Sequence, residues 1–259
     1  MRRRLDAALL LDKPVGLGSN AALQAAKRLF RAEKAGHAGT LDPLASGLLL
    51  LLFGDATKFA GPQLEADKSY LATVRLGVTT TTGDAEGEVI ERRSVSASTA
   101  QVESALEKFR GPIWQVPPMY SALKLEGKPL YLLAREGKTV ERRPRAISIH
   151  ELEQVSLRQD LLTLRVRCSK GTYVRSLAED IGRALGTGAH LAALRRTSAG
   201  GLSLDGATTL DALAEMTEEE RNRRLLPLDA LLGNLPRLDC GAEQEVRLRK
   251  GQAIQVGQG

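Results

Sequence analysis

The chain is poor in residues on which several kinds of protein depend. It has only two cysteines, Cys168 and Cys240, and their spacing fits neither a metal site nor a disulfide framework. We therefore expect both to be free thiols in a reducing, cytoplasmic setting. With four tyrosines, four phenylalanines and one tryptophan, the chain also has few side chains for an aromatic binding surface.

Long apolar stretches are absent as well. No segment approaches the ~18 uninterrupted apolar residues of a membrane helix. The apolar stretch near the N-terminus is bounded by Asp6 and Asp12, and it is too short for the core of a signal peptide. These absences predict a soluble protein without membrane contact.

Basic residues, by contrast, are in excess. Lysine and arginine number 37 against 31 aspartates and glutamates, which gives a formal net charge of +6 and a pI near 9.5. Such a balance favours polyanionic partners such as nucleic acid. A length of 259 residues with 42% hydrophobic content is enough for one large domain with a small appendage.

Strand and helix patterns alternate irregularly along the chain. A Ser-x-x-Gln capping box marks the helix that begins at Ser98, and Ser19 or Asn20 is expected to cap an earlier helix. Because no regular βαβ repeat is present, the pattern favours an α+β fold. We expect strands at 7–12, 48–53, 69–76, 147–157, 161–169 and 191–198, a hairpin at 79–92, and helices at 21–32, 98–110 and 174–185.

The end of the chain has a different composition. Prolines punctuate the stretch LLPLDALLGNLP at 225–236, which we interpret as a boundary. The residues after it are too few for an independent domain.

The segment GHAGTLDPLASG at 36–47 is the first candidate for chemistry. Gly36 and Gly39 allow positive φ or close backbone approach, and Pro43 fixes the backbone directly after Asp42. A run of five leucines follows and would anchor this loop, so Asp42 is expected to be held in place. An ordinary turn, capped by Asp42 and with His37 on the surface, remains an alternative.

Two further segments carry candidate side chains. In SKGTYVRSLAEDIG at 169–182, Arg175 lies in the first turn of a helix, where the helix dipole disfavours a cation unless an anion is nearby. Asp42 could be that anion, and a solvated arginine is the alternative. Tyr70 stands early in the strand at 69–76, either as a core residue or as a surface for stacking on a base.

Basic residues gather in the loop-rich region between 124 and 146, and smaller groups follow it. Such charges form either a solvated face or a set of phosphate contacts. They are Lys124, Lys128, Arg135, Lys138, Arg142, Arg143 and Arg145, followed by Arg165 with Arg167 and by Arg195 with Arg196.

Taken together, several segments between about 8 and 200 resemble the TruB family of tRNA pseudouridine-55 synthases, in the order that this family has them. The most specific match is GHAGTLDPLASGLL combined with CSKGTYVRSLAEDIG. The others are LLLDKPVGLGSN, GDATKF, DKSYLATVRLG, GDAEGE, FRGPIWQVPPMYSALKLEGKPLYLLAREG and GAHLAALRR.

The resemblance implies a pseudouridine synthase fold, in which helices flank a mixed, mainly antiparallel sheet. It implies a catalytic domain at 1–230 with an RNA-gripping insertion at about 118–146. Residues 231–259 would be a linker and the start of an incomplete PUA-type domain, which leaves a naturally short chain and a truncated one both open. Gly18 stands where relatives often have a small polar residue.

The resemblance also implies roles for single residues. Asp42 would be the catalytic aspartate, Tyr70 would stack on the target base, and Arg175 would pair with the aspartate. The remaining implied contacts are Lys13, Tyr173 and Leu194 around the pocket, His37 against the flipped-out RNA, and Arg142 and Arg143 in the gripping insertion. The expected substrate is the T-arm of tRNA, bound by a monomer.

Isomerising uridine to pseudouridine breaks the C1′–N1 bond and rejoins the base through C5. Because the reaction is neither a redox step nor a hydrolysis, we expect no metal and no cofactor. Asp42 could attack C6 of the base, attack C1′, or remove a ribose proton, and the sequence leaves these routes open. Two other functions also stay open, a non-catalytic RNA-binding or RNA-folding protein of the same fold and an RNA N-glycosidase.

Overall fold

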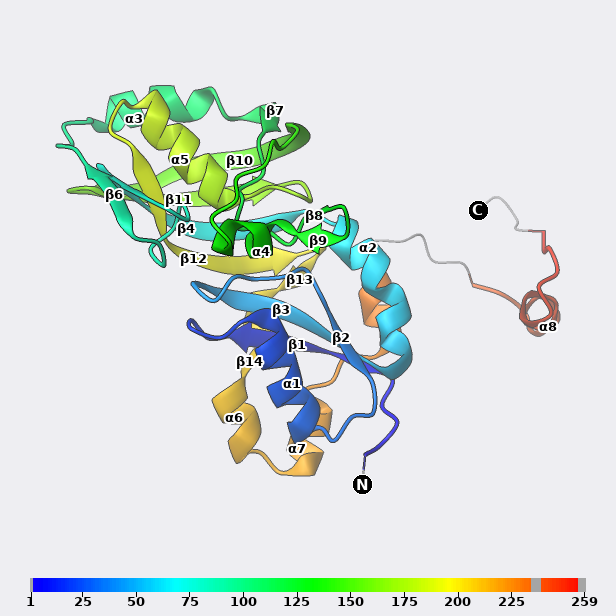
Figure 1. Cartoon of the computed structure of the whole chain (residues 1–259). Helices are drawn as coiled ribbons and strands as arrows, with labels where there is room; N and C mark the ends of the chain where they lie inside the picture. Colours follow the sequence, from blue (N-terminus) through cyan, green and yellow to red (C-terminus); the bar gives the residue numbers. More distant parts are fainter. Residues whose placement is uncertain (1, 234–238, 256–259) are drawn as a thin grey trace.

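A single sheet of ten strands forms the centre of the computed structural model, which describes residues 2–233 and 239–255 (Figure 1). Its strands are β1 (Ala7–Lys13), β2 (Ala35–Ala38), β3 (Ala45–Phe53), β4 (Lys68–Leu76), β7 (Gly111–Gln115), β10 (Arg145–Arg158), β11 (Leu161–Cys168), β12 (Ala189–Ala199), β13 (Leu202–Ser203) and β14 (Thr208–Thr209). Two hairpins stand apart from it, β5 (Val78–Thr80) with β6 (Val89–Arg92) and β8 (Lys124–Leu125) with β9 (Lys128–Pro129).

Short helices connect and cover the strands. The α-helices are α1 (Ser19–Leu29), α2 (Ala60–Glu65), α3 (Thr99–Glu107), α4 (Leu130–Arg135), α5 (Val174–Ala184), α6 (Leu210–Glu215), α7 (Glu218–Arg223) and α8 (Ala242–Arg249). Three 3-10 turns, η1 (Gly54–Phe59), η2 (Leu204–Gly206) and η3 (Leu228–Leu232), complete the described elements.

The main path of the sheet runs β14-β1-β3-β12-β4-β11-β10-β7. Strand β12 lies in the middle, where it pairs parallel with β3 on one side and antiparallel with β4 on the other. Apart from the parallel pair of β1 and β14, the other pairs are antiparallel. The mixed, mainly antiparallel sheet of an α+β fold is therefore confirmed.

The half of the sheet around β1 and β3 is covered on both faces. Alternate residues such as Leu9, Leu49 and Leu51 pack toward α1 and α6, while Leu10 and Leu50 pack toward η1 and η3. Because both faces are buried, these strands can be apolar at every position. This explains the run of five leucines that follows the Asp42 loop.

The half around β4, β11 and β10 is covered on one face only. Ala72, Val74, Leu162 and Leu164 belong to a core under α3 and α5 (Figure 1). The alternate positions of β11 face outward, which is why its burial follows a period of two. The two halves of the sheet meet at β12.

Most expected elements are present, with a correction at the start of α1. The capping box of Ser98 and Gln101 is confirmed at α3. At α1, however, the cap residue is Gly18, and neither Ser19 nor Asn20 caps the helix. The buried Ser19 hydroxyl bonds the backbone of Leu41 instead, donating to its oxygen at 2.9 Å and accepting from its nitrogen at 2.7 Å.

The C-terminal part is described only in pieces. Of the expected linker and PUA-type start at 231–259, residues 234–238 and 256–259 lie outside the described residues. Leu231 of η3 is buried in the core beside β1 and β3, and α8 has no buried residue. Within the ranges described, no helix has both the length and the apolar character needed to cross a membrane.

Candidate active site

The loop that carries Asp42 connects β2 to β3, and backbone contacts hold it in place. The oxygen of Pro43 accepts a hydrogen bond from the nitrogen of Gly16 at 2.8 Å, and Ala45 donates to the oxygen of Asp42 at 3.0 Å. Gly47 has φ +97°, and a Cβ atom there would lie 2.3 Å from the oxygen of Arg196. A glycine is needed at this point because β3 and β12 approach so closely.

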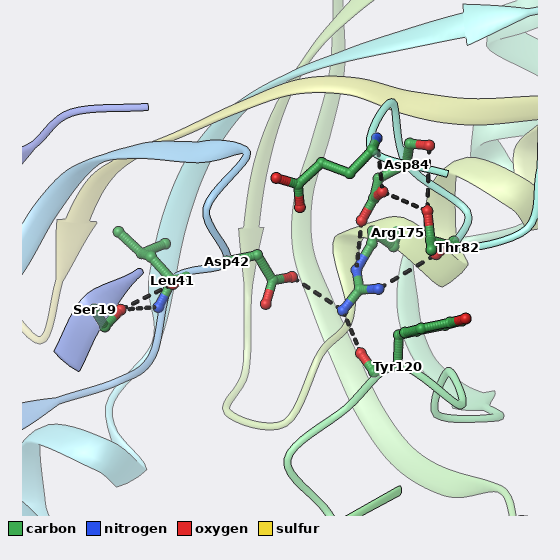
Figure 2. A network of polar contacts seen from close by, with 8 residues as sticks. Ser19, Leu41, Asp42, Thr82, Asp84, Tyr120 and Arg175 are labelled. Atoms are coloured by element: carbon green, nitrogen blue, oxygen red, sulfur yellow. Dashed lines mark hydrogen bonds and ion pairs between the residues drawn. The ribbon is translucent and has the colours of Figure 1, made fainter. Parts of the chain in front are cut away.

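Arg175, in the first turn of α5, lies between two carboxylates. Its Nη2 atom is 3.0 Å from Oδ2 of Asp42, and its Nε atom is 3.5 Å from Oδ2 of Asp84. It also donates to the backbone oxygens of Tyr120 at 2.6 Å and Thr82 at 3.3 Å (Figure 2). These partners offset the unfavourable helix dipole, and the ion pair expected between Arg175 and Asp42 is present.

The two members of this ion pair differ in exposure. The side chain of Arg175 is 7% exposed, whereas that of Asp42 is 47% exposed. Figure 2 shows the carboxylate reaching from its loop toward the guanidinium. One oxygen of Asp42 is thus oriented by a buried cation while the carboxylate stays accessible to a substrate.

Asp84 is a site residue that sequence reasoning missed. It lies between β5 and β6 and is 3% exposed. Its Oδ1 atom accepts hydrogen bonds from the Thr82 hydroxyl at 2.5 Å and from the nitrogen of Glu86 at 3.1 Å. Asp84 belongs to the segment GDAEGE, and an aspartate in a glycine-containing hairpin by itself indicates only a turn. Its partner Arg175 is far away in the sequence, so the pattern does not show the pair.

A pocket of about 330 Å³ opens beside Asp42. Tyr70 from β4, Leu194 from β12 and Tyr173 line it. Burial raises the pKa of Tyr70, and the positive charge of Arg196 opposes that effect. The pocket therefore brings the expected aspartate, arginine, tyrosines and leucine together.

Tyr173 is held at the start of α5 by a buried glutamine. Gln115 donates from Nε2 to the oxygen of Tyr173 at 3.1 Å and accepts from its nitrogen at 2.8 Å. Burial also raises the pKa of the Tyr173 hydroxyl. Gln115, which the sequence did not single out, thus fixes the backbone of a pocket residue.

Lys13 is close to the site but fully buried. Its Nζ atom donates to the oxygens of Pro14 at 2.7 Å and Leu17 at 2.5 Å. Burial lowers the pKa of Lys13 from 10.5 to about 8, although Asp42 and Glu86 act in the opposite direction. Lys13 therefore shapes the turn before α1 and places a positive charge behind the aspartate.

His37 lines a second pocket, of about 480 Å³, which shares Asp42 and Arg175 with the first. Burial and then the charge of Arg196 lower the pKa of His37. Its Nδ1 atom is buried, and no hydrogen-bond partner occurs among the residues that the structure describes. Glu86 lines the same pocket, and burial, Asp84 and Asp42 raise its pKa.

The basic residues separate into exposed and buried ones. Arg143 is exposed, whereas Arg142 is half-buried and donates to the oxygen of Pro117 at 3.0 Å. Arg195 pairs with Asp12 at 2.7 Å. Arg196 is 1% exposed, so neither of the two interpretations of the basic residues, a solvated face or a phosphate contact, fits it.

No cluster of three or more His, Cys, Asp or Glu side chains in the described ranges is arranged to hold a metal ion. In the first pocket, Asp42 is surrounded instead by cations, tyrosines, serines, threonines and apolar side chains. The donor set of the pocket thus suits a polar organic ligand in contact with a carboxylate.

Comparisons with known proteins agree with this geometry. The family model of TruB family pseudouridylate synthase (N terminal domain) matches residues 27–174, which is more than half of the chain. The model of the tRNA pseudouridylate synthase B C-terminal domain matches residues 175–233.

Similar curated proteins are named tRNA pseudouridine synthase B. The one from Burkholderia mallei is 60% identical over 257 residues, which cover 99% of this chain and 85% of that protein. The one from Ralstonia nicotianae is 56% identical over 257 residues, which cover 98% of this chain and 82% of that protein.

Solved structures show the same fold. A chain from the crystal structure of a Cbf5-Nop10-Gar1 complex superposes with a TM-score of 0.72 at 29% identity, over 90% of this chain and 63% of that chain. A chain from the structure of an H/ACA RNP bound to a substrate RNA containing 2′-deoxyuridine superposes with a TM-score of 0.69 at 27% identity. The match covers 89% of this chain and 62% of that chain. This chain thus spans less than two thirds of those two. Together with its site, these matches show that the chain belongs to the TruB family of pseudouridylate synthases.

Proposed function

We propose that this protein isomerises uridine 55 in the T-loop of tRNA to pseudouridine. The observation that carries the proposal is the half-exposed carboxylate of Asp42, which the buried Arg175 holds at the mouth of a pocket. Support for a tRNA substrate comes from the similar proteins, which are named tRNA pseudouridine synthase B. A tRNA substrate implies a reaction in the cytoplasm, and we propose a monomer as the working form.

Asp42 is the group that starts the reaction. The nearby guanidinium of Arg175 favours the ionised carboxylate and fixes its direction. An ionised carboxylate can attack C6 of the base, attack C1′, or remove a ribose proton. Each route ends with the C1′–N1 bond broken, the base turned within the pocket, and a new bond to C5.

Tyr70 and the apolar walls retain the base while it turns. In this proposal the ring of Tyr70 stacks on the uracil, and its hydroxyl helps to remove the C5 proton. Leu194 and Tyr173 line the same pocket, and they exclude water that would otherwise capture the detached base. The pocket volume of about 330 Å³ falls within the range of small-ligand sites.

A uridine in a folded T-loop reaches this pocket only after it is flipped out, which costs a few kcal/mol. Contacts between RNA phosphates and exposed basic residues of the segment 118–146, which we name the basic segment, offset this cost. Lys124, Lys128 and Arg143 are exposed members of it. The second pocket, which adjoins Asp42 and holds His37, Tyr131 and Arg135, receives RNA next to the flipped base.

Product analysis tests this proposal. The protein is incubated with a T-arm stem-loop RNA, and the RNA is examined by chemical mapping for pseudouridine and by mass spectrometry. We expect pseudouridine at one position with no change in RNA mass, and no product when cytidine replaces the target uridine. An abasic site would indicate an N-glycosidase, and RNA bound without covalent change would indicate a binding protein.

A further inference from the structure

Arg196 is a buried cation that the reaction described above does not use. Its side chain is 1% exposed, and its Nε atom donates to the oxygen of Leu48 at 2.7 Å. Its Nη2 atom donates to the oxygen of Gly39 at 2.9 Å. Among the ion pairs of residues 2–233 and 239–255, none includes Arg196. Burying a charge without a carboxylate partner is costly, which makes arginine an unusual residue at this position.

The position of Arg196 in the sheet connects two parts of the site. On β12 it stands opposite Gly47 of β3 on one side and opposite Tyr70 of β4 on the other. Its guanidinium bonds the oxygen of Gly39, in the loop of Asp42, and Arg196 lines the same pocket as its cross-strand neighbour Tyr70. One side chain thus links the loop of the aspartate to the strand of the tyrosine.

The loop is shaped to accept this guanidinium. Gly39 has φ +82°, and a Cβ atom there would lie 3.2 Å from Nη1 of Arg196. That distance is tighter than ordinary contact, so a side chain at Gly39 would press on the arginine. The glycine in the Asp42 loop and the arginine on β12 therefore fit each other.

We propose that Arg196 is a positioning residue that holds the Asp42 loop in place relative to Tyr70, its cross-strand neighbour, so that tyrosine and aspartate act on the same base. This inference rests on the proposed function of the site. A planar guanidinium with several fixed donors can bond two backbone oxygens, here those of Leu48 and Gly39, at once. A lysine would keep the charge but could not reproduce this set of bonds.

The first test measures single-turnover rates on a T-arm RNA at increasing protein concentration. We expect Arg196→Lys to lower the plateau rate about 10²-fold, the effect of a misplaced catalytic group, with the half-saturating concentration nearly unchanged. The matched control is Arg221→Lys, because Arg221 also bonds two backbone oxygens, those of Leu213 and Met216, far from the site. The control should keep the parent plateau. A parent-like plateau in Arg196→Lys would overturn the proposal.

The second test asks whether Arg196 acts through Tyr70. The substitution Arg196→Lys is repeated in a Tyr70→Phe background, where the hydroxyl is already absent. We expect its further effect on the plateau to be much smaller than in the parent, because the two changes disrupt one interaction. The full loss in both backgrounds would mean that Arg196 does not act through the tyrosine.

A third measurement does not depend on turnover. The protein is labelled with ¹³C at Cζ of tyrosine, and the Tyr70 resonance is assigned with Tyr70→Phe. We expect Arg196→Lys to move this resonance and its titration, while Arg221→Lys leaves both in place. An unmoved resonance would contradict an effect of Arg196 on Tyr70 even if the parent made no pseudouridine, so failure here is separate from failure of the proposed function.

A folding defect would not leave the question open. Thermal unfolding followed by circular dichroism shows whether Arg196→Lys is folded. If it is not, Gly39→Ala disturbs the same contact from the loop side, and we expect it to lower the plateau and move the Tyr70 resonance. A folded Gly39→Ala variant with the parent plateau and resonance would overturn the proposal.

Discussion

Asp42, Tyr70 and Arg175, which we name the floor of the active site, and the basic segment are built in opposite ways. Asp42, Tyr70 and Arg175 extend from a loop, a central strand and a helix, and bonds to backbone atoms hold the loop, the strand and the Arg175 side chain in place. The basic segment contains the short elements β8, β9 and α4 and the first two residues of β10, and Leu130 is buried within it. Chemistry requires fixed geometry, whereas a grip on RNA requires reach and exposed charge.

The two regions nevertheless meet around Arg175. Tyr120, at the start of the basic segment, accepts a hydrogen bond from Arg175 through its backbone oxygen (Figure 2). Ser121 lines both pockets. We therefore expect changes in the floor to lower the rate at saturating RNA, and changes in the exposed part of the segment to lower affinity.

The largest expected effect is that of Asp42→Asn. The amide keeps the shape of the carboxylate but is a poor nucleophile, so we expect the rate at saturating RNA to fall ~10⁴-fold or more. RNA affinity, measured by filter binding, should stay within about tenfold of the parent, because the basic segment is untouched. Pseudouridine formation at a tenth of the parent rate would remove Asp42 from this role.

Lys13 offers a test of burial beside the floor that needs no RNA. Its pKa is lowered to about 8 in the folded protein, below its ordinary value of 10.5. Between these two pH values the unfolded chain binds a proton that the folded protein does not, so this group makes the free energy of unfolding rise with pH. The rise is about 3 kcal/mol at most.

The check on Lys13 is urea unfolding of the parent and of Lys13→Met at pH 8 and pH 10. Other groups with shifted pKa values, such as Lys68 and Cys168, remain in both proteins. The difference between the two pH dependences therefore isolates Lys13. Equal pH dependences would show that folding does not lower the pKa of Lys13.

Two substitutions of Tyr70 distinguish between its role in stacking and its role in proton transfer. Tyr70→Phe keeps the ring and should keep RNA affinity, whereas Tyr70→Leu should weaken binding by ~1–3 kcal/mol if the ring stacks on a base. Isothermal titration with a T-arm RNA measures both. A Phe variant that turns over as fast as the parent would show that the hydroxyl does not remove the C5 proton.

The smallest expected effect is in the basic segment. Arg143→Ala removes an exposed charge, so the slope of log affinity against log salt should flatten by ~0.7 to ~0.9 if one phosphate contact is lost. Arg142→Ala is the comparison, because this half-buried side chain is already bonded to Pro117. Combining the two should weaken binding of many RNAs while the saturated rate stays near that of the parent. A salt slope equal to the parent's would mean that Arg143 lies on a plain solvated face.

Local patterns in the sequence predict much of this structure. Alternating apolar residues in β10 and β11 and the capping box at Ser98 depend only on near neighbours. The loop at 36–47 likewise shows from its glycines and proline that Asp42 is held. Such features can be predicted because their physical causes lie within a few residues.

Contacts between distant parts of the chain are what sequence reasoning missed. Ser19 does not cap its helix because its hydroxyl bonds the backbone of Leu41. Asp84 belongs to the site because it pairs with Arg175. Arg143 and Arg196 carry the same charge, but one is exposed and the other is buried between β3 and β4. Composition cannot distinguish them, since burial depends on how the strands are ordered in the sheet.

The most direct test of the division between floor and segment is one titration. Single-turnover pseudouridine formation on one T-arm RNA is measured against protein concentration for Asp42→Asn and for Arg143→Ala. The account predicts that Asp42→Asn has no measurable plateau although it binds the RNA. It predicts that Arg143→Ala reaches the parent plateau at a higher concentration. A normal plateau in Asp42→Asn, or a collapsed plateau with unchanged half-saturation in Arg143→Ala, would contradict it.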